Sequence, residues 1–494
     1  MPTTRAVAAD PQALLAEARL LVRKHQFDDA LQRLSGLTRF DERFGEAEAQ
    51  ELDVLILAGR HDDALARLET AVSLRPTSAD ALDALAYFAR SLGKHELSNS
   101  LYRDASAAAP DDAQILYNLA TSERSFGDLA AAASAAQRAL DRDPSALPAL
   151  LLRSELAKAT PAHNNIPDLE RRRRDAGDDR SRMFVGYALG KEYHDLGQHT
   201  DAFAAFVDGA AARRRSLRYD VAVDEEKLAR IARVFTREWF ERTGTSRPER
   251  KHIFIFGLPR SGTTLVERIL SALPDVRSNG ETDNFTSALF RNTPPGPGDL
   301  IARSAHAAFE DVGHDYDRLS GGSASCTTIE KLPLNYLYAG LIARALPEAH
   351  LIHVRRPPLD SCFAMFRTLF GQAYPFSYDF RDLARYYVAY DRLMEHWRQT
   401  MPDRLIEIDY DDLVRAPDKV ARKLASRCGL AWSQDALDLA KNTAPSLTAS
   451  AAQVRGSIYT SSSGSSKAYA KELAPLSQEL RRNGVRLDVT DGET

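Results

Sequence analysis

The chain is poor in cysteine and contains no long apolar run, and each of these absences excludes a class of protein. Its three cysteines, Cys326, Cys362 and Cys428, show no C-x-x-C spacing. Such a set predicts neither a disulfide framework nor a zinc site and is typical of a reducing compartment. No stretch approaches the ~18 apolar residues of a membrane-spanning helix, and the first ten residues lack the apolar core of a secretory signal. We therefore expect a cytoplasmic protein without a membrane span.

The chain also has almost no excess of one charge. Its 65 Lys and Arg residues face 69 Asp and Glu residues, a net charge of −4. A dedicated nucleic-acid binder needs a basic surplus, so this class is disfavoured. With 44% hydrophobic and 27% charged residues the chain has the balance of a folded protein. Its 494 residues exceed one ordinary domain of ~150, and we expect two or three.

The first half of the chain is an internal repeat. Four sets of residues recur every 34 positions, and they are Gly59, Gly93 and Gly127; Pro76, Pro110 and Pro144; Ala64, Ser98 and Ala132; and Ala71, Ala105 and Ala139. Glycine can end a helix, proline can open the next turn, and small residues let two helices approach closely.

This pattern resembles the tetratricopeptide repeat over roughly residues 11–215. It departs from that family at Ala89 and Glu123, where an aromatic residue is usual. The resemblance implies an all-α solenoid, and we assign residues 1–220 to it. Two interpretations remain open: the concave face holds a peptide or protein partner, or the repeats only support the second half or a homodimer.

The pattern changes at residue 251. Short apolar runs at 253–256, 351–354 and 405–408 alternate with segments of helix length. This alternation predicts an α/β domain, a parallel sheet covered by helices, over residues 250–494. Residues 221–249 join the two halves, and 221–242 read as a connecting helix.

The strongest local motif is I-F-I-F-G-L-P-R-S-G-T-T-L-V-E-R-I-L at 253–270. It predicts a strand, a turn containing Gly257 and Gly262, and an amphipathic helix. Such a turn directs backbone N–H groups and a helix N-terminus toward a phosphate. The G-x-x-x-x-G spacing matches a nucleotide P-loop, but Thr263 stands at the position of its lysine. We also expect no apolar strand ending in Asp to supply a metal ligand. A kinase or NTPase is therefore the weaker alternative.

P-R-S-G-T-T at 259–264 resembles the 5′-phosphosulfate loop of sulfotransferases that use 3′-phosphoadenosine 5′-phosphosulfate (PAPS). This match extends over most of residues 250–475, and the whole arrangement resembles bacterial tetratricopeptide-repeat sulfotransferases, relatives of the tyrosylprotein sulfotransferases. The resemblance implies sulfuryl transfer from PAPS to a hydroxyl acceptor without a metal. It also implies that the 5′-phosphosulfate is bound by Arg260, Ser261, Gly262, Thr263 and Thr264.

A second motif, H-V-R-R-P-P-L-D-S-C-F-A at 353–364, places Arg355 and Arg356 at the end of a predicted strand. Arginine binds phosphate bidentately, and such strand ends hold ligands. In the family an arginine here and a serine eight positions later bind the 3′-phosphate. Counted from Arg356, that position is Ala364. Either Ser361 supplies the hydroxyl or the 3′-phosphate is held less completely.

Two residues match the family's catalytic groups. Glu281, in V-R-S-N-G-E-T at 276–282, matches the general base of the tyrosylprotein enzymes. Lys331, in T-T-I-E-K at 327–331, matches a lysine that stabilises charge on the bridging oxygen, and Arg260 would assist it. The alternative for Lys331 is an ion pair with Glu330 or another carboxylate.

Two further segments match less closely. In I-D-Y-D-D-L at 408–413, Asp411 is predicted to cap a helix. The segment 448–469 resembles one that closes over the cofactor, so that Ser450 and Lys467 would contact the nucleotide. Ser466 stands where bacterial relatives often carry tryptophan.

A non-enzymatic alternative also remains open, a repeat scaffold whose sulfotransferase-like domain binds nucleotide without turnover. The departures at Ala364 and Ser466 keep this alternative open. No motif selects among a peptide tyrosine, a sugar, a phenolic metabolite and a lipid as acceptor, although the repeats favour a polypeptide. The sequence does not indicate an oligomeric state.

Overall fold

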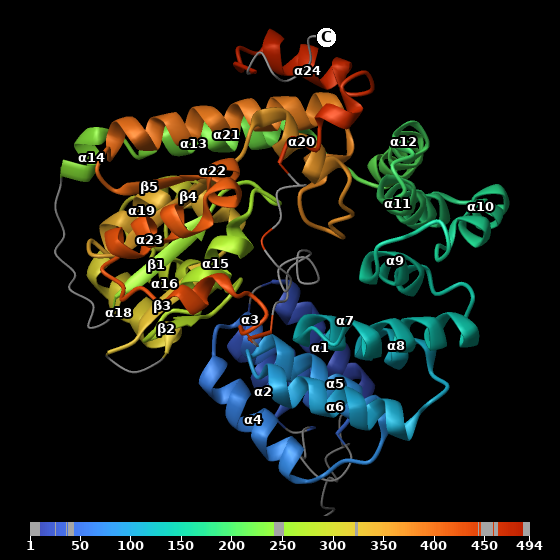
Figure 1. Cartoon of the computed structure of the whole chain (residues 1–494). Helices are drawn as coiled ribbons and strands as arrows, with labels where there is room; N and C mark the ends of the chain where they lie inside the picture. Colours follow the sequence, from blue (N-terminus) through green and yellow to red (C-terminus); the bar gives the residue numbers. More distant parts are fainter. Residues whose placement is uncertain are drawn as a thin grey trace, which may run out of the picture. The chain divides into compact units, whose positions relative to one another are not determined.

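The computed structural model describes residues 10–24, 26–35, 37, 44–241, 251–321, 325–442, 444–445, 458 and 463–487. The chain forms two compact units. One comprises Met1–Arg124 and Asp128–Ala149, and the other Ser125–Gly127 and Leu150–Thr494. Each is described by itself (Figure 1).

The first unit consists of helices joined by short turns. They are α1 (Pro11–Arg23), α2 (Phe27–Leu34), α3 (Glu46–Leu57), α4 (His61–Ser73), α5 (Ala79–Ser91), α6 (His95–Ala108), α7 (Ala113–Phe126) and α8 (Leu129–Arg142). Gly59, Gly93 and Gly127 follow α3, α5 and α7 with φ of 69°, 72° and 89°. A left-handed residue here ends one helix and turns the chain into the next. The predicted 34-residue helical repeat is confirmed.

The helices pack through small and apolar side chains. Ala64, Ala71, Ala105 and Ala139 are fully or almost fully buried. The Oγ of the buried Ser98 on α6 donates to the carbonyl oxygen of Ala86 on α5 at 2.8 Å. Glu123, which replaces the expected aromatic, is also buried, and its carboxylate accepts from Arg103 Nε at 2.6 Å. An ion pair thus occupies the place of an aromatic contact on α7.

The next helices are α9 (Leu147–Leu156), α10 (Ile166–Asp175), α11 (Asp179–Asp195) and α12 (His199–Arg215). The last two form a tight pair because glycines line their contact. A Cβ on Gly186 of α11 would lie 2.7 Å from the backbone nitrogen of Gly209 on α12, and one on Gly190 would lie 2.5 Å from the Phe206 ring. These glycines set how closely α11 and α12 approach.

The second unit is built on a five-stranded sheet in the order β2-β3-β1-β4-β5, and every pairing is parallel. The strands are β1 (His252–Phe256), β2 (Val276–Ser278), β3 (Thr327–Lys331), β4 (His350–Arg355) and β5 (Leu405–Asp409). β1, β4 and β5 confirm the three predicted strands. The sequence analysis missed β2 and β3, which carry polar and charged residues between their few apolar ones.

Helices cover both faces of this sheet (Figure 1). The helices and 3₁₀ turns of this part are α13 (Val221–Val234), α14 (Arg237–Glu241), α15 (Thr263–Ser271), α16 (Asn284–Arg291), α17 (Leu300–Ser304), α18 (Phe309–Ser320), η1 (Pro333–Leu337), α19 (Ala339–Ala345), α20 (Pro358–Phe366), η2 (Pro375–Tyr378), α21 (Phe380–Thr400), α22 (Tyr410–Arg415), α23 (Pro417–Arg427), η3 (Gln434–Leu437), η4 (Lys467–Tyr469) and α24 (Ala474–Arg482).

Alternate residues of β1 point to opposite faces. Ile253 and Ile255 belong to an aliphatic core with α15 and α23. On the other face Phe254 lies with its ring centroid 5.9 Å from Phe285 of α16 and 5.1 Å from Tyr316 of α18. A strand that is buried on both faces reads as a continuous apolar run, which is why it was visible in the sequence.

The expected single helix over 221–242 is two helices, α13 and α14. Phe235 leaves the helical conformation, with φ −97° and ψ 67°. Its ring is buried, with centroids 4.8 Å from Trp239 and 6.4 Å from Trp397. Aromatic packing at this break turns the chain between the helices.

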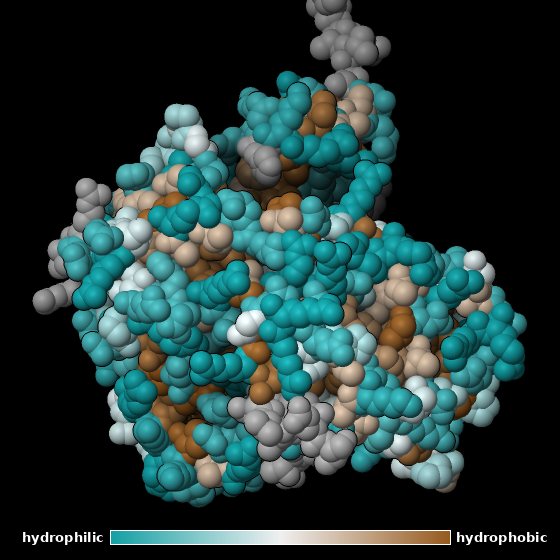
Figure 2. Space-filling view, turned by 90° about the horizontal axis from the view of Figure 1, so that it is seen from above, coloured by the Kyte–Doolittle hydropathy of each residue, from teal (hydrophilic) through white to brown (hydrophobic). Residues whose placement is uncertain are grey.

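None of the helices in the described residues is long and apolar enough to cross a membrane. The face shown in Figure 2 is mostly hydrophilic, with small apolar areas between polar residues. The 27% of charged residues in the sequence is consistent with such a surface.

Candidate active site

The loop after β1 has a backbone that demands glycine. Gly257 and Gly262 have φ of 157° and 104°. A Cβ on Gly257 would lie 2.5 Å from the carbonyl oxygen of Val354, and one on Gly262 would lie 2.3 Å from the ring of Tyr410. Arg260 itself has φ 66°, a strained conformation that side chains rarely adopt. The loop is therefore held in one shape by its neighbours.

Hydroxyl groups line the start of α15, directly after this loop. Ser261, Thr263 and Thr264 are all buried. Among the described residues the Oγ of Ser261 has no hydrogen-bond partner. A buried hydroxyl without a partner is costly, and a helix N-terminus attracts negative charge. Together these features suit an anionic group such as a phosphosulfate.

Lys331 ends β3 beside the loop. It pairs in register with Ile255 of β1, and its side chain is completely buried. The ammonium contacts the carboxylate of Glu281 and lies 3.8 Å from Oε2 of Glu267. The Glu281 side chain remains 35% exposed, so an acceptor can reach it. The structure thus brings together two predicted residues that lie 50 positions apart.

Glu330, the neighbour of Lys331, points to the other face of the sheet and is not its partner. It is fully buried, and its two oxygens accept from Asn335 Nδ2 at 2.9 Å and Thr282 Oγ1 at 3.1 Å. Burial raises the pKa of Glu330 to about 8. Of the alternative left open for Lys331, the ion pair with Glu330 is excluded by the alternation of side chains along the strand, whereas an ion pair with another carboxylate, that of Glu281, is present.

The two predicted 3′-phosphate arginines lie differently. Arg355, the last residue of β4, is half exposed and lies 3.8 Å from the carboxylate of Glu407. The Arg356 Nη1 donates to the carbonyl oxygen of Arg260 at 3.2 Å, and its guanidinium lies 5.1 Å from the Tyr410 ring centroid. Arg356 therefore links the end of β4 to the glycine loop. Ser361 and Ala364 are both buried on α20.

The C-terminal segment is attached to α20 by a carboxylate that the sequence analysis did not single out. Asp360 accepts from the backbone N–H of Gly464 and of Ser466, each at 2.7 Å. Ser466 is buried and Lys467 is exposed. Ser450 lies outside the described residues.

The junction after β5 differs from the prediction in two ways. Asp409, not Asp411, caps α22: its Oδ1 accepts from the N–H of Asp411 at 2.9 Å and of Asp412 at 3.2 Å. Asp409 is also the last residue of β5, so an apolar strand does end in Asp. Because this carboxylate is used as a helix cap, it has a structural role here.

The negative charge of Glu281 acts on the phenol of Tyr374. Burial raises the pKa of the Tyr374 phenol, and the negative charge of Glu281 raises it further. The Tyr374 ring packs edge-on against Phe370, with centroids 4.9 Å apart. Tyr374 also has φ 54°, a second strained residue near the site. Sequence reasoning missed this side chain because nothing local connects it to residue 281.

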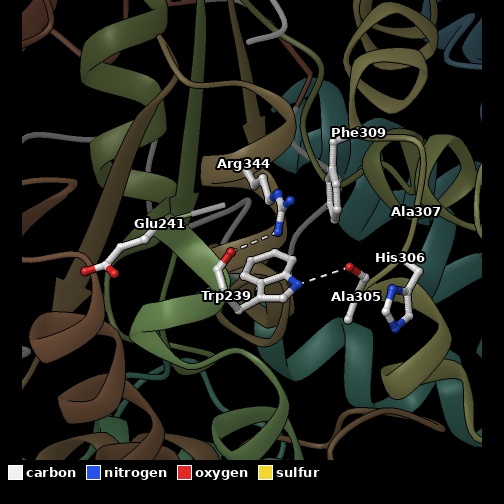
Figure 3. Close-up of a pocket in the computed structure, with 7 residues that line it drawn as sticks. All are labelled: Trp239, Glu241, Ala305, His306, Ala307, Phe309 and Arg344. Carbon is white, nitrogen blue, oxygen red and sulfur yellow. Dashed lines mark hydrogen bonds between the residues drawn. The ribbon is translucent and has the colours of Figure 1, made fainter. Parts of the chain in front are cut away.

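A separate cavity of about 510 Å³ is lined by none of the predicted site residues; its lining residues are Trp239, Glu241, Ala305, His306, Ala307, Phe309 and Arg344. The Arg344 guanidinium packs against the rings of Trp239 and Phe309, 4.3 and 4.7 Å from their centroids (Figure 3). It also donates to the carbonyl oxygen of Trp239 at 3.0 Å. These contacts tie α14, α18 and α19 together.

Comparison with known proteins points to one family for the part of the second unit that carries the sheet. Residues 252–434 match the model of the sulfotransferase family. An uncharacterized protein of Aquifex aeolicus (strain VF5) is 29% identical over 324 residues, 62% of this chain and 42% of that protein. The chain thus spans about two fifths of that relative. A "Putative protein-tyrosine sulfotransferase" of Caenorhabditis briggsae is 26% identical over 194 residues, 37% of this chain and 68% of that protein.

Solved structures of two kinds, sulfotransferase domains and tetratricopeptide-repeat proteins, also align with this chain. The sulfotransferase domain from the curacin biosynthetic pathway aligns with 48% of this chain and 97% of its own, at 17% identity and a TM-score of 0.35. The tetratricopeptide-repeat protein YrrB aligns with 40% of this chain and 91% of its own, at 16% identity and a TM-score of 0.26. Residues 252–434 form a domain of the sulfotransferase family, and tetratricopeptide-type helical repeats precede it along the chain.

Proposed function

We propose that the chain transfers a sulfuryl group from PAPS to a hydroxyl acceptor. The observation that carries this proposal is the contact of Lys331 with Glu281 beside the glycine loop, at the carboxyl end of a parallel sheet. Ligands of such folds bind at this edge. We assign the reaction to residues 250–494, the repeats to 1–220 and the connection to 221–249.

The donor site would be built by the ends of β1 and β4. Arg260, Ser261, Gly262, Thr263 and Thr264 would hold the 5′-phosphosulfate. The buried hydroxyls and the glycine backbone of the loop support this assignment. PAPS supplies an activated sulfuryl group when it is bound.

The rest of the donor would lie toward β4 and the C-terminal segment. Arg355, Arg356 and Ser361 would hold the 3′-phosphate, while Ser450 and Lys467 would contact the nucleotide. The contact of Arg356 with the carbonyl oxygen of Arg260 and the attachment of Gly464 to α20 support this placement.

Glu281 would act as the general base. Its partly exposed carboxylate would take the proton of the acceptor hydroxyl, whose oxygen then attacks sulfur. The buried Lys331 ammonium and the Arg260 guanidinium would stabilise the negative charge that develops on the departing phosphate oxygen. Because these two cations supply the positive charge, the proposal includes no metal ion.

The acceptor we favour is a tyrosine of a peptide. The Tyr374 ring, whose pKa burial and the charge of Glu281 raise and which packs edge-on against Phe370, would receive a phenol ring by packing against it. The repeats provide a surface of the kind that binds polypeptides. The name of the C. briggsae relative points in the same direction.

Donor binding is tested first, by calorimetric titration with the PAPS product 3′-phosphoadenosine 5′-phosphate (PAP). We expect micromolar binding without metal, weakened at least about tenfold in Arg260→Ala because a charge-assisted contact is lost. The exposed Arg427→Ala is the matched control and should bind as the wild type does. Preference for ATP·Mg²⁺ over PAP would favour an NTPase instead.

Catalysis is tested by transfer of labelled sulfuryl from PAPS to tyrosine peptides, phenols and sugars. Glu281→Gln should lower kcat by about 10²- to 10⁴-fold while leaving the Kd for PAP unchanged, since it removes only the base. Glu310→Gln, an exposed glutamate at the start of α18, is the control. PAP binding without transfer to any acceptor would support the scaffold alternative.

A further inference from the structure

The base of the proposed reaction shares its counter-ion with a second carboxylate. Lys331 contacts Glu281 and lies 3.8 Å from Oε2 of Glu267. The Glu267 side chain is only 12% exposed, and that of Lys331 is completely buried. The Lys331 ammonium is thus the counter-ion of two carboxylates. Of the three side chains, only that of Glu281 is substantially exposed to solvent.

Glu267 is also tied to the loop that carries Glu281. The Ser278 hydroxyl donates to Oε1 of Glu267 at 2.6 Å, and the Gly280 N–H donates to the Ser278 Oγ at 3.0 Å. The Lys331 N–H donates to the carbonyl oxygen of Gly280 at 2.9 Å. These hydrogen bonds connect α15, the end of β2 and β3 to one another.

We infer that Glu267 is a positioning residue for the proposed sulfuryl transfer, because it holds the Lys331 ammonium in place when Glu281 takes up the acceptor proton. On protonation Glu281 loses its charge and most of its attraction for Lys331. Glu267 then remains as the carboxylate beside the ammonium. The inference rests on the proposed function, since it assigns a role within that reaction.

The charges that act on Glu267 come from β3, from α15 and from the loop that carries Glu281. Burial is the largest influence and raises the pKa of Glu267 above its ordinary value, although the Lys331 ammonium, the Ser278 hydroxyl and Arg268 lower it; the charge of Glu281 also raises it. Burial and the charge of Glu281 also raise the pKa of Tyr374.

The test is Glu267→Gln, whose amide keeps the volume and can still accept from Ser278 while the negative charge is lost. We expect kcat to fall at least about tenfold while the Kd for PAP stays within about threefold. The pH–rate profile should also change, because the variant removes a negative charge beside the Lys331 ammonium. Glu267→Asp keeps the charge and should restore part of kcat. Glu310→Gln is again the control.

Two outcomes overturn the inference. In the first, Glu267→Gln lowers the yield of folded protein, but the folded molecules keep the kcat and the pH profile of the wild type. Glu267 then has only a structural role. Should the Gln variant not fold, Ser278→Ala takes its place, because it removes the hydroxyl that donates to Glu267 Oε1, and a wild-type kcat and pH profile in that variant contradict the role. If the wild type neither binds PAP nor transfers sulfuryl, the proposed function itself fails. This failure is seen in the wild type without any variant, so it is distinguishable from failure of the inference.

Discussion

At the scale of single residues, Glu330 is a carboxyl group that the fold keeps away from water. Its side chain accepts from Thr282, next to Glu281, and from Asn335 in η1. With a pKa raised to about 8 by burial, it carries a proton at neutral pH. It therefore acts as a neutral hydrogen-bonding group that contacts the residue next to Glu281.

This carboxyl group should make stability depend on pH. Below its ordinary pKa of 4.5 Glu330 is neutral in both the folded and unfolded states, and above about 8 it is charged in both. Between these values the free energy of unfolding should fall as pH rises, with a slope of up to about 1.4 kcal/mol per pH unit from this group. Glu330→Gln should lack this part of the slope.

The measurement is denaturant unfolding of both proteins between pH 5 and pH 9. At each pH the free energy of unfolding of the variant is subtracted from that of the wild type. Glu310→Gln, which alters an exposed carboxylate, should keep the slope of the wild type. Equal slopes for Glu330→Gln and the wild type would show that Glu330 is ionised in the folded protein.

At the scale of elements, the glycine loop and α22 fit together only because Gly262 has no side chain. A Cβ there would lie 2.3 Å from the ring of Tyr410, the first residue of α22. The φ of 104° adds backbone strain for any other residue. Arg356, stacked over the same ring, would be displaced with it.

We therefore expect Gly262→Ala to weaken PAP binding by at least about tenfold, from a strain and clash of about 1–3 kcal/mol. Calorimetric titration measures this loss. Gly93→Ala is the control for strain alone, because Gly93 has φ 72° and no heavy atom near its Cβ position. It should lower stability without changing PAP binding. Unchanged affinity in Gly262→Ala would contradict the loop assignment.

At the scale of the whole molecule, α11 and α12 belong to the unit that carries the sheet. The Tyr187 hydroxyl donates to the carbonyl oxygen of Phe366 at 3.1 Å, and Arg214 Nε donates to Asp382 at 2.9 Å. His194 Nδ1 lies 2.7 Å from the hydroxyl of the buried Tyr469. The last helical pair is thus part of the packing of α20, α21 and η4.

A chain that begins at Leu150 should therefore fold and bind PAP within about threefold of the full-length affinity. A chain that begins at Val221 loses the partners of Phe366, Asp382 and Tyr469 and should unfold at a clearly lower temperature. Thermal unfolding and PAP titration of both fragments test this expectation. Failure of the longer fragment to fold would show that the second unit needs the first.

Much of this protein is determined by short-range patterns, and these could be predicted from the sequence. The 34-residue period placed the turns at Gly59, Gly93 and Gly127 because helix ends need a left-handed residue. The apolar runs predicted β1, β4 and β5 because apolar side chains dominate these strands, whereas the fully buried β3 carries Thr, Glu and Lys and has no such run. The loop after β1 was predictable because its glycines are a local requirement of the backbone.

What only the tertiary structure decided is which side chains meet. The strand order places the ends of β2, β3 and β1 side by side, so Glu281, Lys331 and Glu267 come together although they are distant in the chain. The same order buries Glu330. Charge pairing depends on distance and burial in space, and neither quantity is encoded in local spacing. The sequence alone therefore determined the elements and the loop, while the partners of each charged group followed from the packed sheet.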